Sequence, residues 1–173
     1  MILSKRDHAI SLVDKRIKDL QRWSNTDKER VLQWFGRTDE GTRITLLTGL
    51  TAIIRVSKTL TGRNFTRWDS ERFKHIGCVP NPNKSGVAAS VCSPDTVTHT
   101  IAIHPEFCTI RDFSWKKDSV VSTLIHEVSH FDDTMGARDH RYFMEECLTF
   151  GTENPSQAID NADSIAGYVI YNA

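Results

Sequence analysis

The chain has 173 residues, of which 39% are hydrophobic and 25% are charged. This length and composition are typical of one folded globular domain and exclude a disordered or fibrous chain. Lys and Arg number 22 and are balanced by 22 Asp and Glu, so no overall charge would draw the chain onto nucleic acid or an anionic membrane surface. We therefore expect neither nucleic acid nor a membrane as a partner.

The first third of the sequence predicts three helices. Apolar residues recur every three or four positions over residues 4–23 and again over residues 42–60, which is the period of a helix with one buried face. Between these patterns, Thr26 with Glu29 three residues later is typical of a capping box that opens a second helix. Gly36 is expected to end that helix.

A small sheet is predicted downstream of Gly62, the residue expected to mark the end of the third helix. β-Branched and aromatic residues come in three short runs, at residues 73–79, 87–92 and 98–103. The Pro-Asn-Pro-Asn segment at residues 80–83 is typical of a turn. We expect these runs to form a small, mainly antiparallel sheet.

The helical pattern returns in the last third of the chain. It covers residues 119–133 and 142–150, and a last helix is expected from about residue 154 toward the C-terminus. The predicted fold is therefore α+β in a single domain. Residues 1–62 form its helical part, and residues 63–173 hold the sheet and the residues that carry the chemistry.

The chain contains four cysteines, Cys78, Cys92, Cys108 and Cys147. None of them forms a C-x-x-C pair, so a zinc ribbon is not expected. We favour one or two disulfides in an oxidising compartment over free buried thiols, which are also common in cytosolic cores. The pairing cannot be read from the spacing.

The beginning of the chain does not look like a secretory signal. Residues 1–6 read Met-Ile-Leu-Ser-Lys-Arg, without the uninterrupted apolar core of a signal peptide, and no later stretch approaches membrane-spanning length. A leader removed before this numbering begins, an export route that reads no N-terminal signal, or a protein that stays inside the cell would each account for this.

Residues 120–131, Val-Val-Ser-Thr-Leu-Ile-His-Glu-Val-Ser-His-Phe, contain the pattern H-E-x-x-H within a helical run. Residues four apart lie on one face of a helix, so His126 and His130 could bind one metal ion, with Glu127 near enough to handle a bound water. The neighbouring residues are apolar, and two histidines and a glutamate buried there would be costly to desolvate without a metal or a hydrogen-bond network. The alternative is a pair of surface histidines on an ordinary helix.

A catalytic zinc site usually takes three protein ligands, so a third ligand is expected downstream. Asp133 and Gly136 stand where a metzincin has Gly and His, so His140 is not that ligand. Among the carboxylates Asp139 fits best, because a turn at Gly136 could bring it back toward the histidines. The alternatives on a following helix are Glu145, Glu146 and Glu153.

The residues within and after the H-E-x-x-H pattern resemble the motifs of one family. Residues 136–143, Gly-Ala-Arg-Asp-His-Arg-Tyr-Phe, resemble the motif G-T-x-D-x-x-Y-G, with Ala137 and Phe143 in place of Thr and the final Gly. Residues 124–131 are similar to T-L-x-H-E-x-S-H-F. That family is the aspzincins, which comprise the deuterolysins and the peptidyl-Lys metalloendopeptidases. The resemblance implies a zincin-like domain whose H-E-x-x-H helix carries the active site.

The resemblance also implies roles for single residues. Asp139 would be the third zinc ligand, and Tyr142 would stabilise the transition state. The Asn-Ala-Asp segment at residues 161–163 is similar to a family segment whose aspartate, in lysine-specific members, lines the pocket for the residue after the cut. Asp163 would then favour a Lys or Arg side chain, which satisfies a buried carboxylate.

The sequence thus predicts a zinc-dependent endopeptidase with one catalytic Zn²⁺. The assigned residues are His126, His130 and Asp139 as metal ligands, Glu127 and Tyr142 as catalytic groups, and Asp163 as the substrate-binding group. We expect a monomer that acts outside the producing cell, as a secreted protease, an effector or a toxin, on a protein or peptide substrate. An inhibitor or immunity protein is a candidate partner. Two other classes stay open: a non-catalytic zinc-stabilised binding domain, and a helical partner-binding module without metal.

Overall fold

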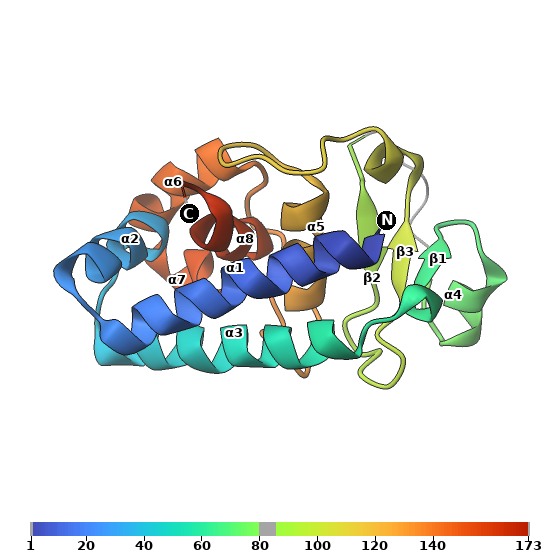
Figure 1. Ribbon diagram of the computed structural model, residues 1–173, viewed down its shortest axis with the longest axis horizontal. Coiled ribbons are helices and arrows are strands. Elements are labelled where there is room, and N and C mark those ends of the chain that lie inside the picture. Colours follow the sequence, from blue (N-terminus) through green and yellow to red (C-terminus); the bar gives the residue numbers. More distant parts are fainter. Residues whose placement is uncertain (1, 80–85, 173) are drawn as a thin grey trace.

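Residues 2–79 and 86–172 are described by the computed structural model (Figure 1). The α-helices are α1 (Ile2–Arg22), α2 (Asn25–Phe35), α3 (Glu40–Thr59), α4 (Glu71–His75), α5 (Val120–Ser129), α6 (Met144–Glu153), α7 (Pro155–Ala158) and α8 (Ala162–Ile170). The strands are β1 (Phe65–Arg67), β2 (Ala89–Val91) and β3 (Ile101–Ile103), and 3-10 turns cover Gly62–Asn64 and Pro105–Cys108. The turn expected at residues 80–83 lies outside the described residues.

The long helices α1 and α3 pack side by side along one face of the molecule (Figure 1). Each buries one apolar stripe at helical spacing, as the sequence predicts. The stripes include Leu12, Val13 and Leu20 on α1 and Leu46, Leu50 and Ile53 on α3. Full burial of one such side chain is worth roughly 1.5–3 kcal/mol, so this pair of helices forms a firm support for the elements behind it.

The second helix begins two residues earlier than predicted. Ser24 is its N-cap: the Ser24 N–H donates to Asp27 Oδ2 at 2.8 Å, and the Ser24 hydroxyl accepts from the Asp27 N–H at 3.4 Å. The capping box expected at Thr26 and Glu29 is therefore wrong. The physical reason lies at Trp23, whose φ of 53° ends α1 and leaves the next residue extended and free to cap.

Of the two glycines expected to end helices, only one does so. Gly36 closes α2 with φ 64° and donates its N–H to Leu32 O at 2.8 Å. A Cβ at Gly36 would meet Gly151 O at 2.2 Å, so no larger residue fits there. Gly62 does not end α3: the helix ends at Thr59, the following Leu60 is extended, and Gly62 opens a 3-10 turn.

The sheet has the strand order β1-β3-β2. β2 and β3 lie within the predicted runs 87–92 and 98–103 and pair antiparallel, but β1 pairs parallel with β3, so the sheet is mixed rather than mainly antiparallel. The strand expected at residues 73–79 is wrong, because residues 71–75 form α4. Local capping explains the difference: the Ser70 hydroxyl accepts from the Arg72 N–H at 3.2 Å and starts a helical turn.

α5 crosses the interior of the molecule and packs against α1, α3, α8 and β2 (Figure 1). Its side chains Val121, Ile125 and Val128 are almost completely buried, which fixes the helix within the core. The predicted helix at residues 142–150 corresponds to α6. The single C-terminal helix expected from about residue 154 is divided into α7 and α8.

One disulfide joins Cys78 to Cys92, whereas Cys108 is exposed and Cys147 is buried as free thiols. The prediction of one or two disulfides is confirmed, and the structure contains one. The link ties the segment after α4 to the segment after β2. Across the described part of the chain, no helix is both long and apolar enough to cross a membrane.

Candidate metal centre

The two histidines of the H-E-x-x-H pattern come together at the end of α5. The N-cap of this helix is Ser119, whose side chain and backbone form a reciprocal cap with Ser122. His130 follows its last residue but keeps helical angles, φ −73° and ψ −25°. Residues 126 and 130 therefore remain one turn apart, and their Nε2 atoms lie 3.0 Å from one another.

The other nitrogen of each ring is held by an acceptor. His130 Nδ1 lies 2.6 Å from the carbonyl oxygen of Ala137, and His126 Nδ1 lies 2.6 Å from Asp163 Oδ1. A carbonyl oxygen and an ionised carboxylate only accept, so both Nδ1 atoms donate, and in the neutral rings both Nε2 atoms carry a lone pair. Two lone pairs only 3.0 Å apart repel unless a proton or a metal ion lies between them, so in the neutral rings these two nitrogens could bind one metal ion.

Asp139 returns to these rings after a reversal of the chain. Gly136 takes φ 57°, in the region that favours glycine, and the Ala137 N–H donates to Ser129 O at 3.0 Å. Arg138 then forms a parallel bridge with Asn161. Asp139 Oδ1 consequently lies 3.3 Å from His126 Nε2 and 3.4 Å from His130 Nε2.

His126, His130 and Asp139 could together hold a metal ion. One donor atom from each lies within 4.8 Å of the others, and within residues 2–79 and 86–172 no other His, Cys, Asp or Glu cluster has this geometry. Two imidazole nitrogens and one carboxylate oxygen are a usual donor set for catalytic zinc, which keeps a fourth position for water. The competing carboxylates and His140 are outside the group, and His140 Nε2 instead lies 3.1 Å from Asp160 Oδ1.

Glu127 lies beside this donor set. Glu127 is 5% exposed, and its Oε1 atom lies 4.0 Å from His126 Nε2. Burial raises the pKa of Glu127, and the neighbouring histidines oppose that rise. A carboxyl group with a raised pKa is suited to accept and return a proton near neutral pH.

Tyr142 stands at the open side of the centre and is 53% exposed. Burial of the phenol, the charge of Asp139 and a side-chain hydrogen bond to Asp139 raise the pKa of Tyr142 to about 12. The phenol therefore stays protonated at neutral pH and can donate a hydrogen bond. For Asp139 itself, burial alone would raise the pKa, but the contacts with the rings of His126 and His130 outweigh burial and hold that pKa far below its usual value.

Asp163 makes contacts that the sequence did not indicate. Besides Oδ1 on His126 Nδ1, its Oδ2 accepts the N–H of Phe143 at 2.8 Å. Phe143 occupies the place of the last glycine in the family motif and takes φ 67°, a region that glycine enters without strain and a bulky residue rarely does. The hydrogen bond from the Phe143 N–H to Asp163 helps to stabilise this backbone conformation at Phe143.

Asn161 is a functional residue that sequence reasoning passed over, since only the aspartate of the Asn-Ala-Asp segment received a role. It is fully buried. Its Oδ1 accepts from the N–H groups of His140 and Arg141, each at 2.9 Å, and its Nδ2 donates to Arg141 O at 3.1 Å and Ser164 Oγ at 2.9 Å. The Asn161 side chain therefore links two segments: the loop that carries Asp139, and the segment before α8.

The helical framework, the short sheet and the His-His-Asp donor set on an H-E-x-x-H helix define the zincin class of metallopeptidases. The chain belongs to the aspzincin family: the model of that family, described as lysine-specific metallo-endopeptidase, matches residues 21–170. This match confirms the family resemblance read from the motifs.

Three individual proteins are similar to this chain. A peptidyl-Lys metalloendopeptidase of Pleurotus ostreatus is 51% identical over 47 residues, 27% of this chain and 28% of that protein. One of Armillaria mellea is 45% identical over 47 residues, 27% of this chain and 13% of that protein. The matches thus span less than a third of these relatives. The solved structure of a zinc peptidase from Grifola frondosa has a TM-score of 0.78 and 22% identity, over 99% of this chain and 93% of that chain, and supports the α+β fold.

Proposed function

We propose that this protein is a zinc-dependent endopeptidase that holds one Zn²⁺ through His126, His130 and Asp139. The observation that carries the proposal is the convergence of two Nε2 lone pairs and one carboxylate oxygen, with each Nδ1 already donating to an acceptor. Zinc in this position supplies Lewis acidity, which polarises a peptide carbonyl and acidifies a water molecule. The family description supports the same chemistry.

Glu127 serves as the general base and then as the general acid. Its buried carboxylate accepts the proton of the attacking water and passes that proton to the nitrogen of the leaving amine. The raised pKa of this side chain favours both directions of transfer. Asp163 keeps His126 in the tautomer that presents Nε2.

Tyr142 donates a hydrogen bond to the oxygen on which negative charge develops. Its phenol remains protonated, since its pKa is raised to about 12, and it lies next to Asp139 at the open side of the centre. A donor already in place costs no reorganisation when the charge appears. This role adds to the stabilisation that the metal provides.

A preference for Lys or Arg on the amine side of the cut is part of the proposal. It is supported by the family description and by the names of the two fungal relatives. Asp163 is the residue proposed to line that subsite on the basis of the Asn-Ala-Asp resemblance. Both of its oxygens already accept hydrogen bonds, so its remaining capacity for a substrate ammonium is limited.

We further propose that the protein is a monomer and acts outside the producing cell, as a secreted protease, an effector or a toxin. The Cys78–Cys92 disulfide supports an oxidising environment. The proposed substrate is a protein or peptide in an extended conformation. An inhibitor or immunity protein that covers Tyr142 and Phe143, both exposed, is the partner to search for.

The proposal is tested by casein cleavage with and without a chelator, on the native chain and on Glu127→Ala. We expect cleavage that depends on zinc and falls by roughly 100- to 10,000-fold in Glu127→Ala, while zinc remains bound. Glu146→Gln, which changes an exposed carboxylate paired with Arg141, is the matched control and should keep activity. Zinc binding without any cleavage by the native chain would favour the non-catalytic binding domain instead.

A further inference from the structure

Phe143 combines a strained backbone with an exposed aromatic ring. Its φ of 67° and ψ of 128° lie outside the left-handed helical region in which most non-glycine residues with positive φ are found, so this conformation is costly for a residue with a Cβ. The ring is 61% exposed and belongs to neither hydrophobic cluster of the described residues. Packing of the ring therefore does not offset the cost of the backbone.

Trp23, another aromatic residue at positive φ, shows how such a cost is usually offset. Its φ is 53°, and its ring packs against the core. Lys28 Nζ and Arg43 Cζ also lie 5.7 Å and 5.3 Å from the centroid of that ring. At Phe143 the stabilising contact is made by the backbone instead, since its N–H donates to Asp163 Oδ2 at 2.8 Å. Strain of this kind, without packing of the side chain, is typical of functional sites.

Phe143 lies beside the proposed metal centre. The preceding residue, Tyr142, is hydrogen-bonded to Asp139. Asp163, which accepts the Phe143 N–H, also lies 2.6 Å from His126 Nδ1 through its other oxygen. An extended peptide advances about 3.3 Å per residue. The Phe143 ring is therefore within reach of a substrate side chain one or two residues from a bond that is cut at the metal.

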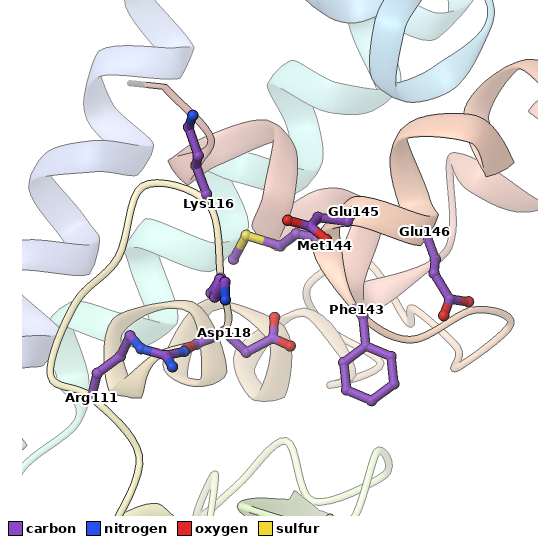
Figure 2. A pocket seen from close by; sticks show the side chains of 8 residues that line it. Arg111, Lys116, Asp118, Phe143, Met144, Glu145 and Glu146 are labelled. Carbon is purple, nitrogen blue, oxygen red and sulfur yellow. The ribbon is translucent and has the colours of Figure 1, made fainter.

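Phe143 also forms part of the wall of a cavity of about 380 Å³, which lies between the loop before α5 and the start of α6 (Figure 2). Burial, followed by the charge of Asp163, raises the pKa of Asp118 in this cavity to about 6. Basic and acidic residues line the cavity in equal number, so a charged side chain would meet both attraction and repulsion there. These residues are Arg111, Lys116, Lys117, Asp118, Glu145 and Glu146.

The apolar part of the cavity wall comes from Phe143 and Met144. Figure 2 shows their side chains leaving the start of α6 in different directions. Met144 is 2% exposed and belongs to the core, whereas the ring of Phe143 extends away from the helix. The exposed apolar surface at this end of the cavity is therefore that of the ring. An apolar side chain that packs on the ring removes both surfaces from water.

We propose that the ring of Phe143 forms an apolar subsite for an aliphatic or aromatic side chain of the substrate, at a residue next to the cut or one residue further on. This assignment rests on the proposed endopeptidase function and adds a second determinant of specificity to the preference for Lys or Arg after the cut. The family motif has glycine at this position, so the subsite is a feature of this chain and not of the motif. The strained backbone directs the ring outward, where a substrate can cover it.

Cleavage of a peptide series by the zinc-loaded protein tests the subsite. All peptides keep Lys after the cut and carry Leu, Phe or Ser either at the residue before the cut or at the residue after that Lys. At one of these two positions, the native chain should cleave the Leu and Phe peptides with kcat/KM about tenfold above that of the Ser peptide. Phe143→Gly and Phe143→Ala should bring this ratio close to one. Phe143→Leu keeps an apolar side chain and should retain most of the ratio.

Urea denaturation separates recognition of the substrate from packing of the fold. Phe143→Gly relieves the backbone strain, so its urea midpoint should equal or exceed that of the native chain. Trp23→Gly is the matched control, because it also removes an aromatic ring at positive φ, but a packed one. It should lower the midpoint and leave the peptide ratio unchanged. A lower midpoint in Phe143→Gly, or an unchanged ratio in that variant, would overturn the proposal.

Failure of this inference and failure of the enzymatic proposal give different results. If the native chain cleaves the Leu, Phe and Ser peptides equally well, the endopeptidase stands and the Phe143 subsite is lost. If the native zinc-loaded chain cleaves nothing, the enzymatic proposal is lost, and the affinities of the same intact peptides decide the role of Phe143. Tighter binding of the Leu peptide by the native chain than by Phe143→Gly would then support the subsite, and equal binding would contradict it.

Discussion

The polar groups of the metal centre differ from Asp118, which lies in a cavity between the loop before α5 and the start of α6, in whether the chain itself supplies their hydrogen-bond partners. In the centre, both His Nδ1 atoms, both Asp163 oxygens and the Asn161 amide have hydrogen-bond partners within the chain. In the cavity, the Asp118 carboxylate has none from another described residue. The difference teaches that the side chains which position the proposed metal ligands are held by hydrogen bonds within the chain.

After Glu127→Ala, the largest effect is expected from Tyr142→Phe, which removes one hydrogen-bond donor beside Asp139. Removal of an oxyanion donor typically costs about 100- to 1,000-fold in kcat, so we expect kcat to fall in that range with KM little changed. Steady-state kinetics on a single peptide would measure this. Zinc content must equal that of the native chain, and a rise in KM with unchanged kcat would remove the proposed role of Tyr142.

The next effect concerns the fastening of the loop that carries Asp139. Asn161→Ala leaves buried N–H and carbonyl groups of the loop without partners, each worth about 1–3 kcal/mol. We expect a loss of roughly 2–4 kcal/mol in unfolding free energy by urea denaturation, together with weaker zinc binding. Asn154→Ala is the control, since Asn154 is exposed and makes no side-chain cap hydrogen bond. Equal effects of the two changes would contradict the role of Asn161.

Sequence reasoning reached the features that depend on local spacing. The helical periods of α1 and α3, the stop at Gly36 and the one-turn separation of residues 126 and 130 follow from neighbours along the chain. The predicted start of α2 is wrong because the positive φ of Trp23 has no signature in the sequence. The apolar and β-branched residues around α4 predict a strand, but the cap at Ser70 favours a helical turn.

The parts that depend on contacts between distant segments were harder to predict. The bridge between Arg138 and Asn161 joins two loops, so only the family motif drew attention to Asp139 and Asp163. Nothing in the sequence distinguishes Asp118 from other aspartates, because its character comes from burial near Asp163 and the wall formed by Phe143. A family segment can indicate which residues matter, while the contacts decide what each one does.

The central claim is a single zinc ion held by His126, His130 and Asp139, and zinc content measured after dialysis tests it most directly. The account predicts one zinc per chain in the native protein and in Glu127→Ala, and its loss in Asp139→Ala with the helical content by circular dichroism retained. Retention of zinc by Asp139→Ala at native affinity, or a native chain that binds none, would contradict it.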